Sequence, residues 1–267
     1  MKTLKFKAAL AGLSLSLMAM SPISQATIVL IKTSQGDFEV NLYDQATPKT
    51  VENFLSYVES GEYENSIIHR SVKDFIVQSG GYKIREVTDT VDGETVTEDK
   101  IISVETNASV INEPVYSNVR GTIAMAKIGG NENSATSGWF INLSDNSANL
   151  DNQNGGFTVF GAVTDYGMET LDRIAGLPIY NLGSPFNQAP LQDFTEDDAN
   201  NEVDVTLDNF VKVESITVTD VNQDTATGLN PPLSTYEPSE SSSGGGGSFG
   251  FGFLALLSLL GMRKFKQ

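Results

Sequence analysis

The chain has 267 residues and carries 34 acidic against 17 basic side chains, a formal net charge of −17 at pH 7. A surface this acidic repels nucleic acid and anionic membranes, so neither is expected as a partner. There is no cysteine and only one histidine, which excludes disulfides, thiolate nucleophiles and His-rich metal sites.

Residues 1–26 show the order of parts of a secretory signal peptide. Three lysines lie within the first seven residues, an apolar stretch covers residues 8–20, and Ser24-Gln25-Ala26 resembles a cleavage site. The apolar stretch is short for a transmembrane helix, which needs about 20 residues. We therefore expect an exported protein whose mature chain begins near Thr27, with an uncleaved membrane anchor as the alternative.

Residues 27–220 are expected to form one folded domain in which short strands outnumber helices. A helix is predicted to begin at Thr47-Pro48, with Thr47 as its N-cap, and to end at Gly61; a second helix covers residues 168–174. This composition of elements is typical of a β-barrel or sandwich with two helices packed on it. β-Branched runs and alternating apolar residues predict strands over 27–33, 38–42, near Ile68, and over 75–78, 121–126, 139–143, 158–163 and 209–219.

Two polar stretches of this domain are expected to be loops. Residues 83–107 are acidic and turn-rich at Asp92-Gly93, and residues 184–202 are similarly polar. The second stretch lacks the spacing of an EF-hand loop, so a solvated acidic surface is the better interpretation, and no metal or cofactor is expected. The alternative is Ca²⁺ binding, since that ion prefers oxygen ligands, by the carboxylates of Asp193, Glu196, Asp197 and Asp198.

The C-terminal part has a different composition. Residues 221–248 form a flexible polar linker ending in a Ser/Gly-rich run, and residues 249–267 are apolar and Leu-rich with a basic end. A glycine run, a short apolar helix and a basic end resemble the GlyGly-type C-terminal sorting signals of Gram-negative bacteria. The resemblance implies a tail that is transiently in the membrane and a protein of the periplasm or cell surface; a simple C-terminal membrane tether is the alternative.

Four segments resemble consecutive motifs of the cyclophilin family. IIHRSVKDFIVQSGG (residues 67–81) resembles that family's F-H-R…F-x-x-Q-G-G segment. GTIAMAK (121–127), NSATSGWFINL (133–143) and FTVFG (157–161) resemble the segments that follow it. The resemblance covers residues 28–218 in the correct order. It implies an eight-stranded antiparallel closed β-barrel capped by two α-helices, and the activity of a peptidyl-prolyl cis-trans isomerase.

The resemblance also implies which residues form the site. Arg70 matches the family's catalytic arginine. His69 is expected to be structural, because isomerisation transfers no proton. The implied partners are proline-containing polypeptides, bound by a monomer that assists the folding of exported proteins. The residues that match substrate-binding positions are Phe75, Ile76, Gln78, Met125, Ala126, Phe140, Leu150 and Phe157.

The chemistry of X-Pro isomerisation makes sense of these residue types. Amide resonance sets a barrier of about 18–20 kcal/mol, and at the twisted transition state the proline nitrogen regains its lone pair. A guanidinium donor such as Arg70 near that nitrogen binds the transition state better than either ground state. The proline ring needs an apolar socket, and Gln78 can hold the substrate backbone.

Several positions depart from the family pattern, among them Ser79, which replaces a Gly, and Asn149, which stands where some members have a Trp. Gly138 stands where many cyclophilins carry Gln or Glu, which removes a side chain that helps to contact the substrate backbone; Lys127 replaces an Asn and Ile68 a Phe. Two functions therefore stay open. The intact Arg70 favours an enzyme, whereas Gly138 favours a binding module or chaperone that holds proline-containing peptides with little turnover.

Overall fold

The computed structural model describes residues 27–92, 94–164, 166–220 and 230–237. The predicted signal peptide and the apolar C-terminal segment lie outside the described residues, as does most of the predicted linker. None of the helices in the described ranges is both long and apolar enough to cross a membrane.

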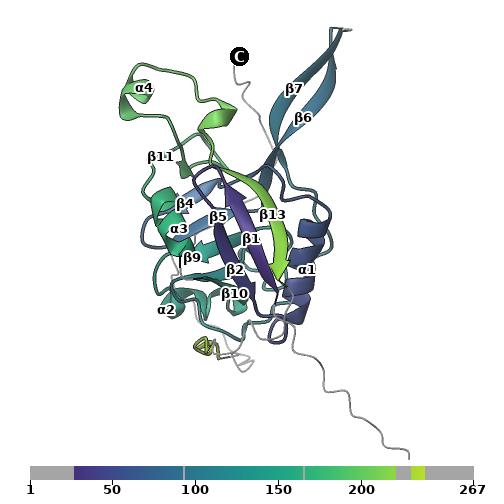
Figure 1. The fold of residues 1–267 in the computed structure, drawn as a ribbon, viewed down its shortest axis with the longest axis vertical. Helices are drawn as coiled ribbons and strands as arrows, with labels where there is room; N and C mark the ends of the chain where they lie inside the picture. The colour runs from purple at the N-terminus through teal and green to yellow at the C-terminus, as the bar shows by residue number, and fades with distance from the viewer. Residues whose placement is uncertain (1–26, 93, 165, 221–229, 238–267) are drawn as a thin grey trace, which may run out of the picture.

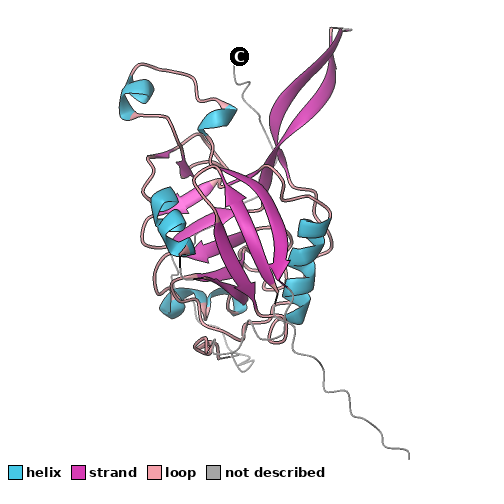
Figure 2. Ribbon diagram, viewed as in Figure 1, coloured by secondary structure: helices cyan, strands magenta, loops and turns pink. Residues whose placement is uncertain are grey.

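Eleven strands of the described chain form one antiparallel sheet in the order β4-β5-β9-β8-β10-β2-β1-β13-β3-β6-β7 (Figure 1). Figure 2 shows few helices around these strands, so the fold is mainly β, as predicted. The strands are β1 (Ile28–Thr33), β2 (Phe38–Leu42), β3 (Ser66–Ile67), β4 (Arg70–Val72), β5 (Ile76–Ser79), β6 (Tyr82–Val91), β7 (Glu94–Ser103), β8 (Thr122–Met125), β9 (Trp139–Asn142), β10 (Val159–Val163) and β13 (Lys212–Asp220), with β11 (Ile179–Tyr180) and β12 (Ala189–Pro190) as a separate pair. The helices are α1 (Pro48–Glu59), α2 (Ser147–Leu150), α3 (Gly167–Ala175) and α4 (Glu196–Asn200).

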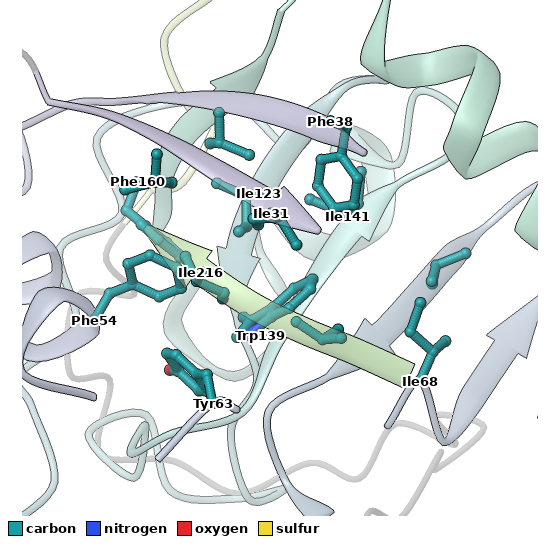
Figure 3. Packing of buried hydrophobic residues seen from close by; sticks show 14 of the residues in the cluster. Ile31, Phe38, Phe54, Tyr63, Ile68, Ile123, Trp139, Ile141, Phe160 and Ile216 are labelled. Carbon is teal, nitrogen blue, oxygen red and sulfur yellow. The ribbon is translucent and has the colours of Figure 1, made fainter. Parts of the chain in front are cut away.

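The larger core cluster packs against one face of these strands (Figure 3). Trp139, Phe160 and Ile123 are completely buried in it, because each occupies a strand position that faces inward. The α1 helix adds Phe54 and Tyr57 to the same cluster. Burying a side chain of this kind stabilises a fold by about 1.5–3 kcal/mol, so this cluster is a main source of stability.

Both predicted helices are confirmed, with one difference at the start of α1. Thr47 occupies the N-cap position, but its hydroxyl donates to the Tyr43 carbonyl (3.2 Å) and does not cap the helix. The carboxylate of Glu113 instead accepts a hydrogen bond from the Thr50 N–H (2.9 Å). A residue distant in sequence therefore satisfies a donor of the first turn.

The stretch over 83–107 was wrongly predicted as a loop, because most of it is a long hairpin. Strands β6 and β7 pair from Tyr82↔Ser103 to Val91↔Glu94, and the hairpin projects from the body of the molecule in Figure 1. Asp92 has a φ of 54°, a conformation that tight hairpin turns require and aspartate tolerates. Acidic residues alternate here with Val and Thr, whose β-strand preference the high charge concealed.

The stretch over 184–202 is mostly loop, as predicted, and it includes β12 and α4. Thr195 and Asp198 form a capping box at the start of α4, in which the Asp198 carboxylate accepts the Thr195 N–H (2.8 Å). The Asp198 carboxylate therefore caps the N-terminus of α4. In the described ranges, no three metal-ligating side chains are grouped so as to hold an ion.

The ladder pairs alone do not show a closed barrel, which stays a prediction. Strands β3 and β4 are two pieces of one segment, separated by Ile68 and His69. The Ile68 N–H donates to the Val211 carbonyl (2.9 Å) beside β13, and the His69 N–H donates to the Gln78 carbonyl (3.2 Å) in β5. This segment therefore contacts strands at both ends of the order from β5 to β13.

Residues 230–237, termed here the C-terminal strap, belong to the stretch predicted as a flexible linker, yet they pack on the domain. The Ser117 N–H donates to the Pro232 carbonyl, and the Ser234 N–H donates to the Val115 carbonyl, both at 2.9 Å. The folded unit therefore includes residues beyond the predicted boundary at 220.

The buried carboxylate of Asp151 joins the strap to the domain. It accepts hydrogen bonds from the Ser117 hydroxyl (2.6 Å), the Asn118 N–H (2.8 Å) and the Thr235 N–H (3.2 Å). Burial raises the pKa of Asp151, but these hydrogen bonds together outweigh burial and hold the pKa below its usual value. The charged form of Asp151 therefore stabilises the fold.

We expect Asp151→Asn to lower the free energy of unfolding by about 2–3 kcal/mol near neutral pH, because an amide group replaces an acceptor of buried donors. A carboxylate with a lowered pKa stabilises the fold above its unfolded-state pKa, and this contribution is lost as the pH falls through the folded-state pKa. Urea unfolding should thus show a smaller difference between variant and wild type in acid. Asp99→Asn, at an exposed aspartate on β7, is the control, and equal stabilities of the two variants would contradict the expectation.

Candidate active site

A second apolar cluster lies on the opposite face of the strands from the larger core cluster. Ile76, Phe140 and Leu150 are buried in it, and Phe75, Ala126 and Phe157 pack against it while staying partly exposed. Alternation along β5 and β9 explains the division, since Val77, Trp139 and Ile141 point to the other side. Six of the eight predicted substrate-binding residues are therefore together.

Two aromatic rings form one part of this cluster. The rings of Phe140 and Phe157 meet edge to face, with centroids 5.8 Å apart and planes at 73°. The Lys127 ammonium lies 4.8 Å from the centre of the Phe157 ring and donates to the Asn154 carbonyl at 2.8 Å. Burial lowers the pKa of Lys127 to about 8. Lys127, which the sequence marked only as a departure, thus holds the loop that carries Phe157.

Strand register brings Arg70 and Gln78 to the same face. Arg70 in β4 pairs with Gln78 in β5, and Gln78 pairs with Phe140 in β9. Residues directly opposite one another in antiparallel strands point to the same side of the sheet. A cation, an amide and an aromatic ring therefore lie in one row beside the second apolar cluster.

The Arg70 guanidinium is held between two glutamines. Its Nη1 donates to Gln78 Oε1 at 3.4 Å, and its Nε donates to Gln188 Oε1 at 3.0 Å. Burial lowers the pKa of Arg70, but an arginine stays charged at neutral pH. Gln188 was missed by the sequence reasoning, because it lies in a stretch predicted as loop, more than a hundred residues from Arg70, and no local pattern marks it.

Met125 lies apart from the other predicted site residues. Its side chain is fully buried in the larger core cluster, on the opposite side of the chain from its neighbours Ala124 and Ala126. It therefore supports the strand from behind and presents no surface to a ligand.

Gly138 lies beside Ala126, whose N–H donates to the Gly138 carbonyl at 2.9 Å. A Cβ added at Gly138 would lie 3.3 Å from the Ala126 Cβ, which is a tight contact. The glycine therefore leaves the row beside the second apolar cluster without a side chain at this position.

His69 is buried next to Arg70. Its ring meets that of Tyr82 edge to face, with centroids 5.1 Å apart. Burial lowers the pKa of His69 to about 4, and the neighbouring charge of Arg70 acts in the same direction. The ring is thus neutral at physiological pH, which agrees with a structural role.

The pKa of His69 can be measured directly, because the chain has no other histidine. We expect its imidazole NMR signal to titrate with a midpoint near pH 4. The fold should lose about 3 kcal/mol as the pH falls from the usual histidine pKa of 6.5 towards 4, because the unfolded chain takes up the proton first. The His69→Gln variant should not show this loss of stability at low pH. A titration midpoint near pH 6.5 for His69 in the wild type would contradict a pKa lowered by burial.

Comparisons with known proteins show which family this chain is similar to. A family model described as "Cyclophilin type peptidyl-prolyl cis-trans isomerase/CLD" matches residues 28–196. A peptidyl-prolyl cis-trans isomerase A of Dickeya dadantii is 39% identical over 183 residues, covering 66% of this chain and 86% of that protein. A peptidyl-prolyl cis-trans isomerase of Acinetobacter baylyi is 37% identical over 160 residues, covering 59% and 76%. The crystal structure of a Cryptosporidium parvum cyclophilin type isomerase matches with a TM-score of 0.50 at 23% identity, covering 73% of this chain and 98% of that one, and so shows a similar fold.

Proposed function

Because this chain belongs to the cyclophilin type peptidyl-prolyl cis-trans isomerase family and is an enzyme of that type, we propose that Arg70 is the catalytic residue acting on X-Pro bonds of polypeptides. The observation that carries the proposal is the row of Arg70, Gln78 and Phe140 across three paired strands. This row joins a charged donor directly to an apolar surface, which is the combination that a proline residue requires.

The mechanism follows from the electronic change in the proline amide. As the bond twists, resonance is lost and the proline nitrogen becomes a hydrogen-bond acceptor. A guanidinium N–H of Arg70 donates to that nitrogen in the transition state and has no such partner in either planar ground state, so it lowers the barrier. Partial burial strengthens the interaction by excluding water. No proton is transferred and no covalent bond forms, so the reaction needs no cofactor.

The second apolar cluster binds the proline ring in this proposal. Phe140, Leu150 and the edge of Phe157 provide an apolar surface next to the row. Gln78, half-buried and in register with Arg70, holds the substrate backbone. The apolar cluster then binds the proline ring and Gln78 binds the substrate backbone. The enzyme thereby holds both groups that rotate relative to each other during isomerisation.

We expect Arg70→Ala to lower kcat/KM in a proline-limited peptide isomerisation assay by about 10²–10³-fold, the usual effect of removing a transition-state donor. The kcat/KM of Arg70→Lys should lie between the values of wild type and Arg70→Ala, because lysine keeps the positive charge but lacks the planar guanidinium. Arg85→Ala, which removes an exposed arginine on β6, is the matched control and should match wild type. Equal rates for wild type and Arg70→Ala would contradict a catalytic role of Arg70.

The second candidate function is a binding module or chaperone that holds proline-containing peptides with little turnover. Gly138 favours it, because the row beside the second apolar cluster lacks a side chain there. The same assay separates the two, since this candidate predicts peptide binding by wild type without acceleration of isomerisation.

We also propose that the strands close into an eight-stranded barrel. The support is that the segment Ser66–Val72, counted as one strand, pairs with β13 through β3 and with β5 through β4, the two ends of the order β5-β9-β8-β10-β2-β1-β13. The β6–β7 hairpin then projects from this ring.

Export, and assistance to the folding of exported proteins, are proposals that depend on residues 1–26 and 238–267, outside the described part. Their support is the signal-peptide pattern and the order of glycine run, apolar stretch and basic end. Mass spectrometry of the protein from its native host tests both ends: we expect a mature N-terminus near Thr27 and cleavage near the glycine run. A mature product ending at Gln267 would remove the sorting-signal proposal and leave the membrane tether.

A further inference from the structure

The stretch between β11 and β12 runs along the outer edge of β4. Gln188 forms a parallel bridge with Arg70, and the Ser71 N–H donates to the Gln188 carbonyl at 2.9 Å. In the ladder, β4 is an end strand whose other side pairs with β5. The backbone around Gln188 therefore covers hydrogen-bonding groups that an edge strand would expose.

The side chain of Gln188 adds a contact that the backbone bridge does not need. Its Oε1 accepts from Arg70 Nε at 3.0 Å, a shorter distance than the 3.4 Å between Arg70 Nη1 and Gln78 Oε1. The two acceptors meet different nitrogens of one planar group. Together they restrict the rotation of the guanidinium plane, which a single acceptor would leave free to pivot.

The position of Gln188 is itself well fixed. The next residues, Ala189 and Leu191, are completely buried in a third apolar cluster with Ile67 and Phe210. Ile67 precedes Arg70 by three residues, so the cluster joins the chain on either side of the contact. The acceptor is therefore anchored to the same structural unit that carries the arginine.

We propose that Gln188 is a positioning residue for catalysis, which orients the Arg70 guanidinium through its Nε. The inference rests on the proposed function of Arg70. A glutamine oxygen can fix the guanidinium without adding a negative charge, so the full positive charge stays available for the proline nitrogen in the transition state. A carboxylate at the edge would instead offset that charge.

The side chain can be tested without disturbing the backbone bridge. Gln188→Met keeps the length and apolar stem but removes the oxygen acceptor, and Gln188→Glu restores an acceptor at the same distance. Gln192→Met is the matched control: that glutamine lies just after β12, and its side chain accepts from Ser34 and Gln35 instead of from Arg70. All three should keep the thermal unfolding midpoint of wild type within a few degrees.

In the peptide isomerisation assay, we expect Gln188→Met to lower kcat about three- to tenfold with KM nearly unchanged, because the lost contact acts on the transition state. Gln188→Glu should recover part of that loss, and Gln192→Met should match wild type. Combined with Arg70→Ala, Gln188→Met should cause no further decrease, since it acts only through Arg70.

The outcomes separate this inference from the proposed function. A low rate for Arg70→Ala together with wild-type kcat for Gln188→Met overturns the positioning role and leaves the catalytic arginine in place. A further decrease of kcat in the double variant, relative to Arg70→Ala alone, also overturns it. A wild-type rate for Arg70→Ala overturns the proposed function and this inference with it.

Discussion

The candidate site depends on the register of β5 between β4 and β9. Gln78 lies opposite Arg70 on one side and opposite Phe140 on the other, so two sets of backbone hydrogen bonds decide which side chains meet. A slip of one residue would exchange the two faces of β5. Val77, completely buried in the larger core cluster, opposes such a slip. The packing that stabilises the fold thereby also fixes the chemistry on the opposite face.

The same constraint explains why neighbouring residues differ so much in role. Trp139 and Ile141 fill the core, while Phe140 between them faces the second apolar cluster. Met125 follows the core pattern of β8, and Ala126 follows the other. A motif therefore contains residues that face the core and residues that face the second apolar cluster. A residue's presence in the motif does not by itself show that its side chain belongs to the site.

Segments outside the main strands supply the contacts that hold the site in place. Gln188, from the stretch before β12, contacts Arg70, and Lys127 holds the loop that carries Phe157. Asp151, which follows the predicted site residue Leu150, accepts hydrogen bonds from the domain and from the C-terminal strap. The buried groups among these, Lys127 and Asp151, tolerate few alternative partners, because an unmade hydrogen bond in the interior costs about 1–3 kcal/mol. These hydrogen bonds therefore specify one conformation for segments that lie outside the regular strands and helices.

The sequence by itself determined the mainly β fold, the two principal helices and most strands, because apolar periodicity and turn residues act over a few neighbours. Motifs in series also led to the prediction that Arg70, Phe75 and Phe140 belong to the site. Only the tertiary structure showed that 83–107 is largely a hairpin, that Met125 faces the core, and that Gln188 and residues 230–237 contact the domain. These features depend on contacts between residues far apart in the chain. Local sequence patterns do not show which distant residue accepts a given hydrogen bond or packs against a given face of a strand.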